Sequence, residues 1–388
     1  MEVLSDPGAR AAAAIVDLHR SGLSRRLLSP AESINAITVG ATSTDGVEVD
    51  LPDTVVDVAG GGPAPYSAIG SGFRRGVKPE VLAPGGRMVF VRPAESEGLA
   101  TLRAAETAAA GPGIQVAAPG IAGALDATSF STGTSNSAAL TTRSIAQILD
   151  VLDGLAGTEG WEFLTPQFRP ALAKTLLVHA AGWGSSAAAL TAQLGLSGNS
   201  RRAQLAQLLG YGSVDPDRTA SADRVRAVLV HASSIAAKEQ HVYRFPLPPS
   251  LAATTEWRRL TVTLGWLSPV SSQSQRYRGA ALSVNSTHSV LGLARAEVDM
   301  QTSQRGTVQH EIFVGEKAVA FNAGEFLELR VSCRPDAGDS ITGSGLVRYG
   351  LAVSLEVSPS LHIDIHEQVA NALRTRVRPS ARTRVPTS

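Results

Sequence analysis

The feature that most constrains the fold is a change in hydrophobic periodicity near residue 222. Beyond it, apolar and polar residues alternate in short runs that are separated by clusters of turn residues. Successive side chains of a strand point to opposite faces, so this period of two predicts strands with one buried face. Several such strands favour an antiparallel, jelly-roll-like β-sandwich over residues 223–376, closed by a helix at about 363–375. The runs are Leu260, Val262, Leu264, Trp266; Val308, His310, Ile312; Leu327, Leu329, Val331; and Leu351, Val353, Leu355.

Before residue 222 the pattern is one of helices and short buried strands. Apolar residues recur at helical spacing in 137–155, and Pro170 and Gly182 bracket a second helix. Such helices around short apolar runs indicate an α/β domain over residues 1–222. The other predicted segments are strands at 35–41 and 81–83, helices at 9–18 and 201–209, a helical or irregular stretch at 99–111, and a disordered basic tail at 377–388.

Composition excludes several classes of protein. The 388 residues are 43% hydrophobic, which is enough for sizeable cores and too much for a disordered chain. Lys and Arg number 35 against 34 Asp and Glu, a balance that gives no support for nucleic-acid binding. The single cysteine, Cys333, can form neither an intramolecular disulfide nor a Cys-based zinc site. No apolar run reaches the roughly 18 residues of a membrane span. Residues 1–10 lack a secretory signal, so we expect a cytoplasmic protein.

One motif places a serine where nucleophilic chemistry is favoured. The sequence GTSNSAA at 133–139 stands at the start of the long predicted helix. Gly133 allows a sharp turn, and the helix N-terminus offers unpaired N–H groups and a positive dipole end to an oxyanion. The same residues also suit an ordinary helix start, in which Thr134 or Ser135 is the N-cap. This heptapeptide alone leaves both interpretations open.

Five segments in a fixed order extend this motif into a pattern: Asn35–Ala41, Pro65–Ser67, Lys78–Val81, Ala83–Gly85 and Gly133–Ser135. Together they resemble the C-terminal half of the catalytic domain of subtilisin-like serine peptidases (peptidase S8), over about residues 30–220. The later sequence GYGSVD at 210–215 resembles the end of that domain. The sequence RFPLPPSL at 244–251 and the β-rich region around it resemble the appended domain of a bacterial subgroup, in which the peptidase is paired with an AAA-type ATPase in anti-phage defence.

The resemblance implies a partial, doubly wound parallel sheet and a peptidase that cleaves polypeptide substrates through an acyl-enzyme. Ser135 matches the nucleophile, and its own backbone N–H matches one oxyanion donor. Gly133 and Thr134 match the elbow before it, and residues 87–116 are an insertion relative to simpler members. The resemblance implies no cofactor and no metal. The wall of the substrate groove is matched by Ala83, Pro84 and Gly85.

Three family motifs are missing from the 388 residues: the strand ending in Asp-(Ser/Thr)-Gly, the His-Gly-Thr-His helix, and the oxyanion Asn, since no Asn precedes Asn35. Asp17 and His19 stand two apart on a predicted helix, so they do not face each other as a catalytic pair would. A serine hydroxyl without a base is a poor nucleophile. We therefore predict an N-terminally truncated subtilase that is inactive by itself; the alternative is an inert binding or assembly protein derived from one.

Two further groups have a functional and a structural interpretation. His362, Asp364 and His366 would share one face of a strand, as metal ligands can. Polar residues at the edge of a helix or strand are the simpler interpretation, and we predict no metal site. Aromatic and arginine residues between 257 and 278 suit a protein interface, although Trp266 is in phase with the predicted core. This second group comprises Trp257, Arg258, Arg259, Trp266, Arg276, Tyr277 and Arg278.

Overall fold

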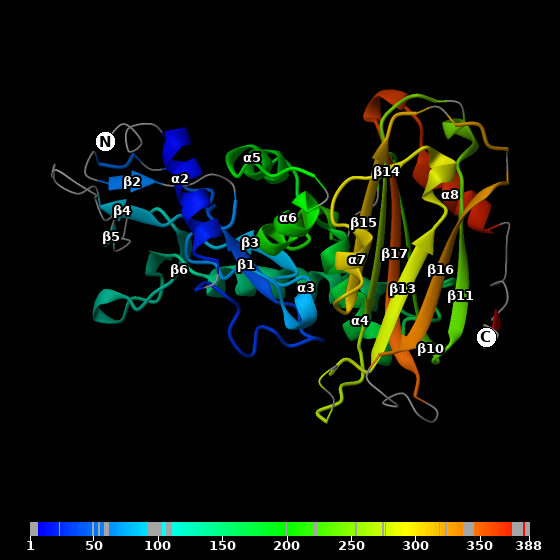
Figure 1. The fold of residues 1–388 in the computed structure, drawn as a ribbon, viewed down its shortest axis with the longest axis horizontal. Coiled ribbons are helices and arrows are strands. Elements are labelled where there is room, and N and C mark those ends of the chain that lie inside the picture. The colour runs from blue at the N-terminus through cyan, green and yellow to red at the C-terminus, as the bar shows by residue number, and fades with distance from the viewer. Residues whose placement is uncertain are drawn as a thin grey trace.

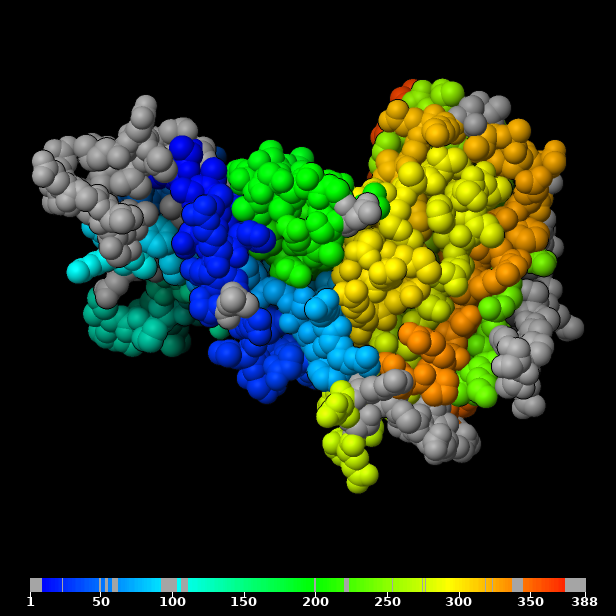
Figure 2. Space-filling model, viewed as in Figure 1, coloured from blue at the N-terminus to red at the C-terminus, as the bar shows by residue number. Residues whose placement is uncertain are grey.

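Helices and small sheets make up the first half of the chain, and two facing β-sheets make up the second (Figure 1). The halves lie side by side along the long axis of the molecule, and Figure 2 shows them touching over a broad junction. The computed structural model describes residues 7–22, 24–48, 50–52, 55–57, 62–91, 103–105, 111–198, 200–219, 223–252, 254–273, 275, 277–317, 319–322, 324–336, 345–374 and 383–384.

The first half is organised around a four-stranded sheet in the order β1-β3-β9-β8. The first three strands of that order are parallel, and Leu82 of β3 lies opposite Gly40 on one side and Ser213 on the other. Most residues of β1 and β3 are buried, as expected for parallel strands. The predicted α/β class and partial parallel sheet are confirmed. The strands are β1 (Val39–Thr42), β3 (Val81–Pro84), β8 (Ala181–Gly182) and β9 (Ser213–Val214).

Five α-helices accompany this sheet, and they include the four that the sequence predicts. The third, α3, packs on β1 and β3, and α4 packs on α3. Helix α3 begins at Thr134, three residues before the predicted start, because Gly133 takes the N-cap position. The fifth, α5, was not predicted because its Ala-rich sequence has no apolar stripe. The helices are α2 (Pro7–Arg20), α3 (Thr134–Leu155), α4 (Arg169–His179), α5 (Ser186–Gln193) and α6 (Arg201–Leu209).

The predicted insertion, residues 87–116, contributes strands to two small sheets, which are completed by β2 before it and β7 after it. One is three-stranded, and the other is the β6–β7 hairpin, which runs directly into α3. The helical alternative for 99–111 is wrong at residues 103–104, which form a strand; most of that stretch lies outside the described residues. The strands are β2 (Val55–Asp57), β4 (Val89–Val91), β5 (Arg103–Ala104), β6 (Ile114–Ala117) and β7 (Thr128–Ser131).

The second half is the predicted antiparallel β-sandwich. Its sheets have the orders β10-β17-β12-β15-β14 and β13-β16-β11-β18. Helix α8 closes one side, as predicted, and packs on β10 and β11. The elements are β10 (Arg226–Ile235), β11 (Glu239–Pro246), β12 (Arg258–Trp266), β13 (Ala280–Ser286), β14 (Ala294–Arg295), α7 (Met300–Ser303), β15 (Val308–Gly315), β16 (Phe326–Pro335), β17 (Val347–Val357), α8 (Ile365–Arg374) and β18 (Thr383–Arg384). Short 3-10 turns are η1 (Phe73–Arg75), η2 (Ile121–Gly123), η3 (Pro166–Phe168), η4 (Pro216–Arg218), η5 (Pro249–Leu251), η6 (His288–Leu291) and η7 (Pro359–Leu361).

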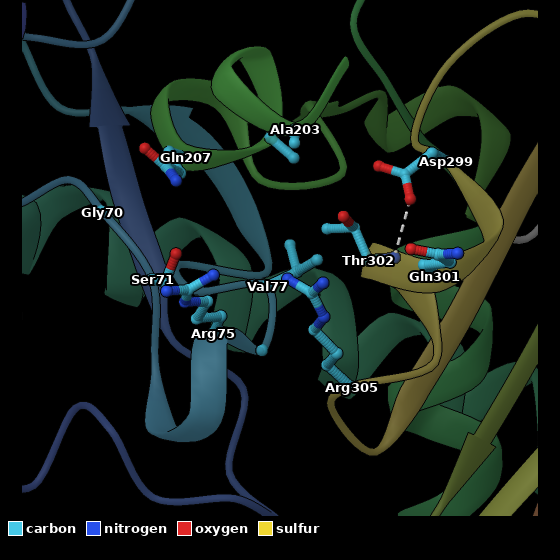
Figure 3. Close-up of a pocket in the computed structure, with 12 residues that line it drawn as sticks. Gly70, Ser71, Arg75, Val77, Ala203, Gln207, Asp299, Gln301, Thr302 and Arg305 are labelled. Atoms are coloured by element: carbon cyan, nitrogen blue, oxygen red, sulfur yellow. Dashed lines mark hydrogen bonds between the residues drawn. The ribbon is translucent and has the colours of Figure 1, made fainter. Parts of the chain in front are cut away.

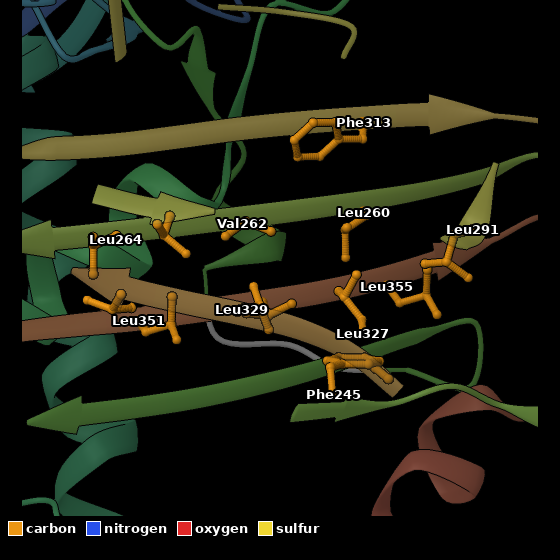
Figure 4. Packing of buried hydrophobic residues seen from close by; sticks show 14 of the residues in the cluster. Phe245, Leu260, Val262, Leu264, Leu291, Phe313, Leu327, Leu329, Leu351 and Leu355 are labelled. Atoms are coloured by element: carbon orange, nitrogen blue, oxygen red, sulfur yellow. The ribbon is translucent and has the colours of Figure 1, made fainter. Parts of the chain in front are cut away.

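The sandwich core is formed by three of the four alternating runs that predicted it, on β12, β16 and β17. The prediction is wrong for the run on β15: Phe313 faces the core, whereas Val308 packs in the cluster of the first half. Leucines of β12, β16 and β17 face one another between the sheets (Figure 4). Trp266 is fully buried and donates its indole N–H to the Ala280 carbonyl at 3.2 Å, so its core interpretation is confirmed. Cys333 is also buried, and burial raises the pKa of its thiol to about 12. On β12, β16 and β17 the apolar phase therefore determines which face of the sheet turns inward. On β15 both faces are buried, so the alternation alone could not identify the inward one.

Helix α4 joins the two halves. Eight of its eleven residues are buried, which is the pattern of a helix covered on all sides. It packs on α3 in the first half and on β12 and β17 in the second. Thr175 donates to the Gly350 carbonyl at 3.2 Å, and the Lys174 ammonium donates to Thr307 Oγ1 at 2.7 Å. His179 is held between the hydroxyls of Thr263 and Ser354, both at 2.9 Å.

The sequence boundaries between domains stay predictions. The boundary at 222 falls in 220–222, and most of the tail from 377 also lies outside the described residues. Within the tail, β18 pairs with the start of β11. Among the described residues, no helix combines the length and the apolar character needed to cross a membrane.

We expect the α4 junction to be intolerant of added volume. A Cβ atom at Gly265 of β12 would lie 2.5 Å from Thr175 Oγ1, which is itself buried. Gly265→Ala should lower the free energy of unfolding by about 1–3 kcal/mol through overpacking. Gly154→Ala is the matched control, because Gly154 is exposed on α3 and a Cβ there meets no atom within 4 Å; it should stabilise by up to about 1 kcal/mol. Urea unfolding of both variants measures the difference, and equal effects would contradict this view of the junction.

Stability should fall in mild acid because of buried histidines. Burial, with His241 adding, lowers the pKa of His231 to about 4, against an unfolded value of about 6.5. Between those pH values the unfolded chain binds more protons, so the free energy of unfolding decreases as pH falls.

His231→Phe should reduce that slope by up to one proton while keeping the aromatic contacts with Phe163 and Tyr243, whose ring centroids lie 4.7 and 5.3 Å away. Unfolding curves at pH 7, 6, 5 and 4 measure the slope. His19→Phe, on the exposed side of α2, is the control and should leave the slope as it is. An unchanged slope in His231→Phe would contradict the assignment.

Candidate active site

Hydrogen bonds join the end of strand β3 to the start of helix α3. The Gly133 N–H donates to the Gly85 carbonyl at 2.9 Å. Ser137 Oγ donates to the carbonyls of Ala83 at 3.0 Å and Pro84 at 3.2 Å. The structure thus brings the two predicted segments, the groove wall and the nucleophile elbow, into direct contact although about fifty residues separate them.

Gly85 is required by this close approach. A Cβ atom there would lie 2.5 Å from Tyr66 Oη, 2.6 Å from Ala41 Cβ and 3.0 Å from Ser137 Oγ. The Tyr66 hydroxyl donates to the Gly86 carbonyl at 2.7 Å, and burial raises its pKa to about 12. Tyr66 is therefore a neutral hydrogen-bond donor at neutral pH, and it supports the loop that faces the elbow.

Ser135 is exposed in the first turn of α3, where backbone N–H groups have no intrahelical partner. Within the described part of the chain its hydroxyl has no hydrogen-bond partner. The N-cap is Gly133, without a side-chain cap, so the N-cap interpretation of Thr134 and Ser135 is wrong. Asn136 beside it is fixed instead, with its amide donating to the Gly85 carbonyl at 3.2 Å and the Ser131 carbonyl at 3.1 Å. The arrangement holds an available hydroxyl on a rigid support.

Sequence reasoning missed three supporting residues. Tyr66 and Ser137 lie inside the quoted motifs, but their long-range partners could not be read from local spacing. Asn136 directly follows Ser135, and an amide at this position could have been expected to hold the loop. None of these side chains adds a base to the site.

No histidine in the described part of the chain is placed to accept the proton of Ser135 through a direct hydrogen bond. All eight histidines lie in the described residues, and none hydrogen-bonds to this serine. His179 is buried in α4, where burial, with Arg226 and His310 adding, lowers its pKa well below the ordinary value. Asp17 and His19 are both exposed on α2. Among the described residues, Ser135 is therefore an exposed serine without a histidine bonded to it.

The remaining candidates have structural roles. His362 lies in a left-handed turn and His366 on α8, so the strand that would have aligned them does not exist. Asp364 accepts from the Glu367 N–H at 2.9 Å at the start of that helix. Among the described residues no three His, Cys, Asp or Glu side chains gather as metal ligands would.

Two of the arginines between residues 257 and 278 that were predicted to form a protein interface are buried instead. Arg278 is buried and pairs with Asp336 at 2.7 Å, and it donates to the Gln304 carbonyl at 3.0 Å. Arg258 is buried at the start of β12. Arg276 lies outside the described residues. Substituting Arg278 would therefore disturb folding rather than test docking.

Comparison with known proteins agrees with this geometry. A model of the subtilase family matches residues 20–212, which contain both the groove wall and the elbow. This part of the chain belongs to the subtilase family. Over 262 residues the subtilase chain is 26% identical to the "uncharacterized protein y4bN" of Sinorhizobium fredii (strain NBRC 101917 / NGR234). That match covers 66% of this chain and 54% of the relative, so the chain spans about half the length of the curated protein it matches.

Two neighbouring serines should respond differently to the same substitution. Ser137→Ala removes a buried hydroxyl that bonds two carbonyls of the groove wall, and should cost about 1–2 kcal/mol of unfolding free energy. Ser135→Ala removes an exposed hydroxyl and should change stability by less than about 0.5 kcal/mol. Thermal and urea unfolding measure both variants. A larger loss for Ser135→Ala would show that Ser135 is a structural residue.

Proposed function

We propose that this chain is the nucleophile-bearing part of a subtilisin-like serine endopeptidase. The observation that carries the proposal is Ser135, exposed at the N-terminus of α3 and placed against the Ala83–Gly85 wall within a subtilase-family segment. Subtilase membership gives serine-type peptide hydrolysis as the chemistry of the family. The expected substrate is a polypeptide that lies along the end of β3.

The chemical role of each residue follows from its position. Ser135 Oγ attacks the carbonyl carbon of the scissile bond, and its proton passes to a base. The Ser135 backbone N–H, free at the helix start, donates to the oxyanion that forms. The C–N bond then breaks as the base returns the proton to the leaving amine, and water releases the acyl group from Ser135. Gly133 and Asn136 keep the elbow fixed during both steps.

The base and its orienting Asp are proposed to come from sequence outside these 388 residues. Two observations support this: the family's Asp and His motifs do not occur here, and the chain covers about half of the relative's length. By itself the chain then lacks the group that makes a serine hydroxyl reactive.

The alternative is an inert binding or assembly protein derived from a subtilase. The observation that favours it is that every histidine is committed elsewhere or lies without a bond to Ser135. In that case the β-sandwich would hold a partner and the elbow would be a structural remnant. For either function the proposed partner is an AAA-type ATPase in a cytoplasmic, anti-phage setting, on the resemblance of the β-rich half alone.

The two functions differ in labelling by a fluorophosphonate probe. The 388-residue chain should not label, because no base activates Ser135. A product that includes in-frame upstream codons for Asp-(Ser/Thr)-Gly and His-Gly-Thr-His should label, and Ser135→Ala should abolish labelling. Thr142→Ala, an exposed hydroxyl further along α3, is the control and should label normally.

Labelling of the 388-residue chain that Ser135→Ala removes would overturn the idea of an external base. Upstream sequence without either motif, or a longer product that does not label, would favour the binding protein.

A further inference from the structure

A cavity of about 310 Å³ lies where the subtilase part meets the sandwich, away from the Ser135 elbow. Its walls come from three places: the loop around residues 70–77, helix α6, and the segment 299–305 that includes α7 (Figure 3). The lining is mostly polar, and the volume is near the lower limit for small-molecule sites. Nothing in the proposed peptidase reaction uses it.

Two arginines face this cavity without a partner. Among the described residues, neither Arg75 nor Arg305 has an ion pair or a side-chain hydrogen bond. The neighbouring Arg74 and Arg278 are different, because both pair with Asp336, at 4.0 and 2.7 Å. Guanidinium groups are the side chains best suited to bind phosphate oxygens. Two of them beside one cavity leave room for a doubly charged anion.

The loop that presents Arg75 is held in an unusual conformation. Arg74 and Arg75 are consecutive and both have positive φ, 52° and 62°, which is rare for residues other than glycine. The turn is closed by Gly72 N–H to Gly76 carbonyl at 2.9 Å, and Phe73 packs edge-on against Tyr277 of the other half. Strained residues of this kind persist where surrounding structure holds them, often at ligand sites.

The opposite side of the cavity carries an acceptor. Asp299 lies across from the two arginines in Figure 3, and one of its oxygens accepts from the Thr302 N–H at 2.9 Å. The second oxygen is available to accept from a ligand hydroxyl. Exposed carboxamides of Gln207 and Gln301 can donate or accept beside it. Donors on one side and an acceptor on the other fit a molecule with an anionic end and a hydroxylated end.

We propose that this cavity binds a small phosphorylated polyol, either a sugar phosphate or a nucleoside monophosphate. Arg75 and Arg305 hold the phosphate, and Asp299 accepts from a sugar hydroxyl. Because the walls come from both halves of the chain, the bound molecule bridges them and stabilises the folded protein as a whole.

The test uses the purified 388-residue chain and four compounds: AMP, glucose 6-phosphate, adenosine and glucose. Calorimetry and thermal unfolding should detect binding of at least one phosphorylated compound, with a raised Tm, and no binding of its unphosphorylated partner at the same concentration. Whichever phosphorylated compound binds more tightly shows whether the ligand is a nucleoside monophosphate or a sugar phosphate. Binding of neither, or equal binding with and without phosphate, would overturn the proposal.

Substitutions of the cavity residues test which side chains contact the bound molecule. Arg75→Gln and Arg305→Gln should each weaken binding about tenfold or more, and Arg305→Lys should retain part of it. Asp299→Asn keeps a capping side chain and should weaken the sugar-bearing compound without weakening inorganic phosphate. Arg143→Gln, which removes an exposed charge from α3, is the matched control and should bind normally. If this control loses as much affinity as Arg75→Gln, only net charge matters and the site does not exist.

Discussion

The packing of helix α4 is the constraint on which both halves of the molecule depend. Leu172 and Leu177 have no exposed surface. Between them, the Lys174 ammonium donates to Thr307 of the sandwich and to the Asn35 carbonyl of the first half, and Thr175 donates to Ala171 in its own helix and to Gly350 of the sandwich. Separating such a helix from either neighbour would expose apolar surface and leave buried hydrogen-bond donors without partners. The subtilase part and the sandwich therefore share one core at this junction.

The same logic applies at the elbow on a smaller scale. Strand β3 ends at Pro84, and the next residues bind the first turn of α3 through backbone carbonyls. Rigid backbone contacts of this kind place a serine more accurately than flexible side chains could. The elbow that holds Ser135 is thus fixed by contacts within the described residues.

The sequence predicted what depends on local periodicity and missed what depends on distant partners. The alternation around Trp266 predicted that its segment is a strand of a β-sandwich and which face of that strand is buried. The ordered motifs predicted that the segment with Ser135 lies beside the segment with Gly85. The pairing of Arg278 with Asp336 joins residues 58 positions apart, so a pattern read over a few residues made it look like a surface charge. The N-cap interpretation failed for a related reason, since the Gly133–Gly85 bond decides where α3 starts.

The burial of Cys333 has a practical consequence. Only the thiolate reacts with alkylating reagents, and a thiol whose pKa is near 12 is almost wholly protonated at neutral pH. The chain has no other cysteine. A cysteine introduced on the surface would therefore be the one rapidly modified group in the native protein, so a spectroscopic probe could be attached at a chosen position without first removing the native thiol.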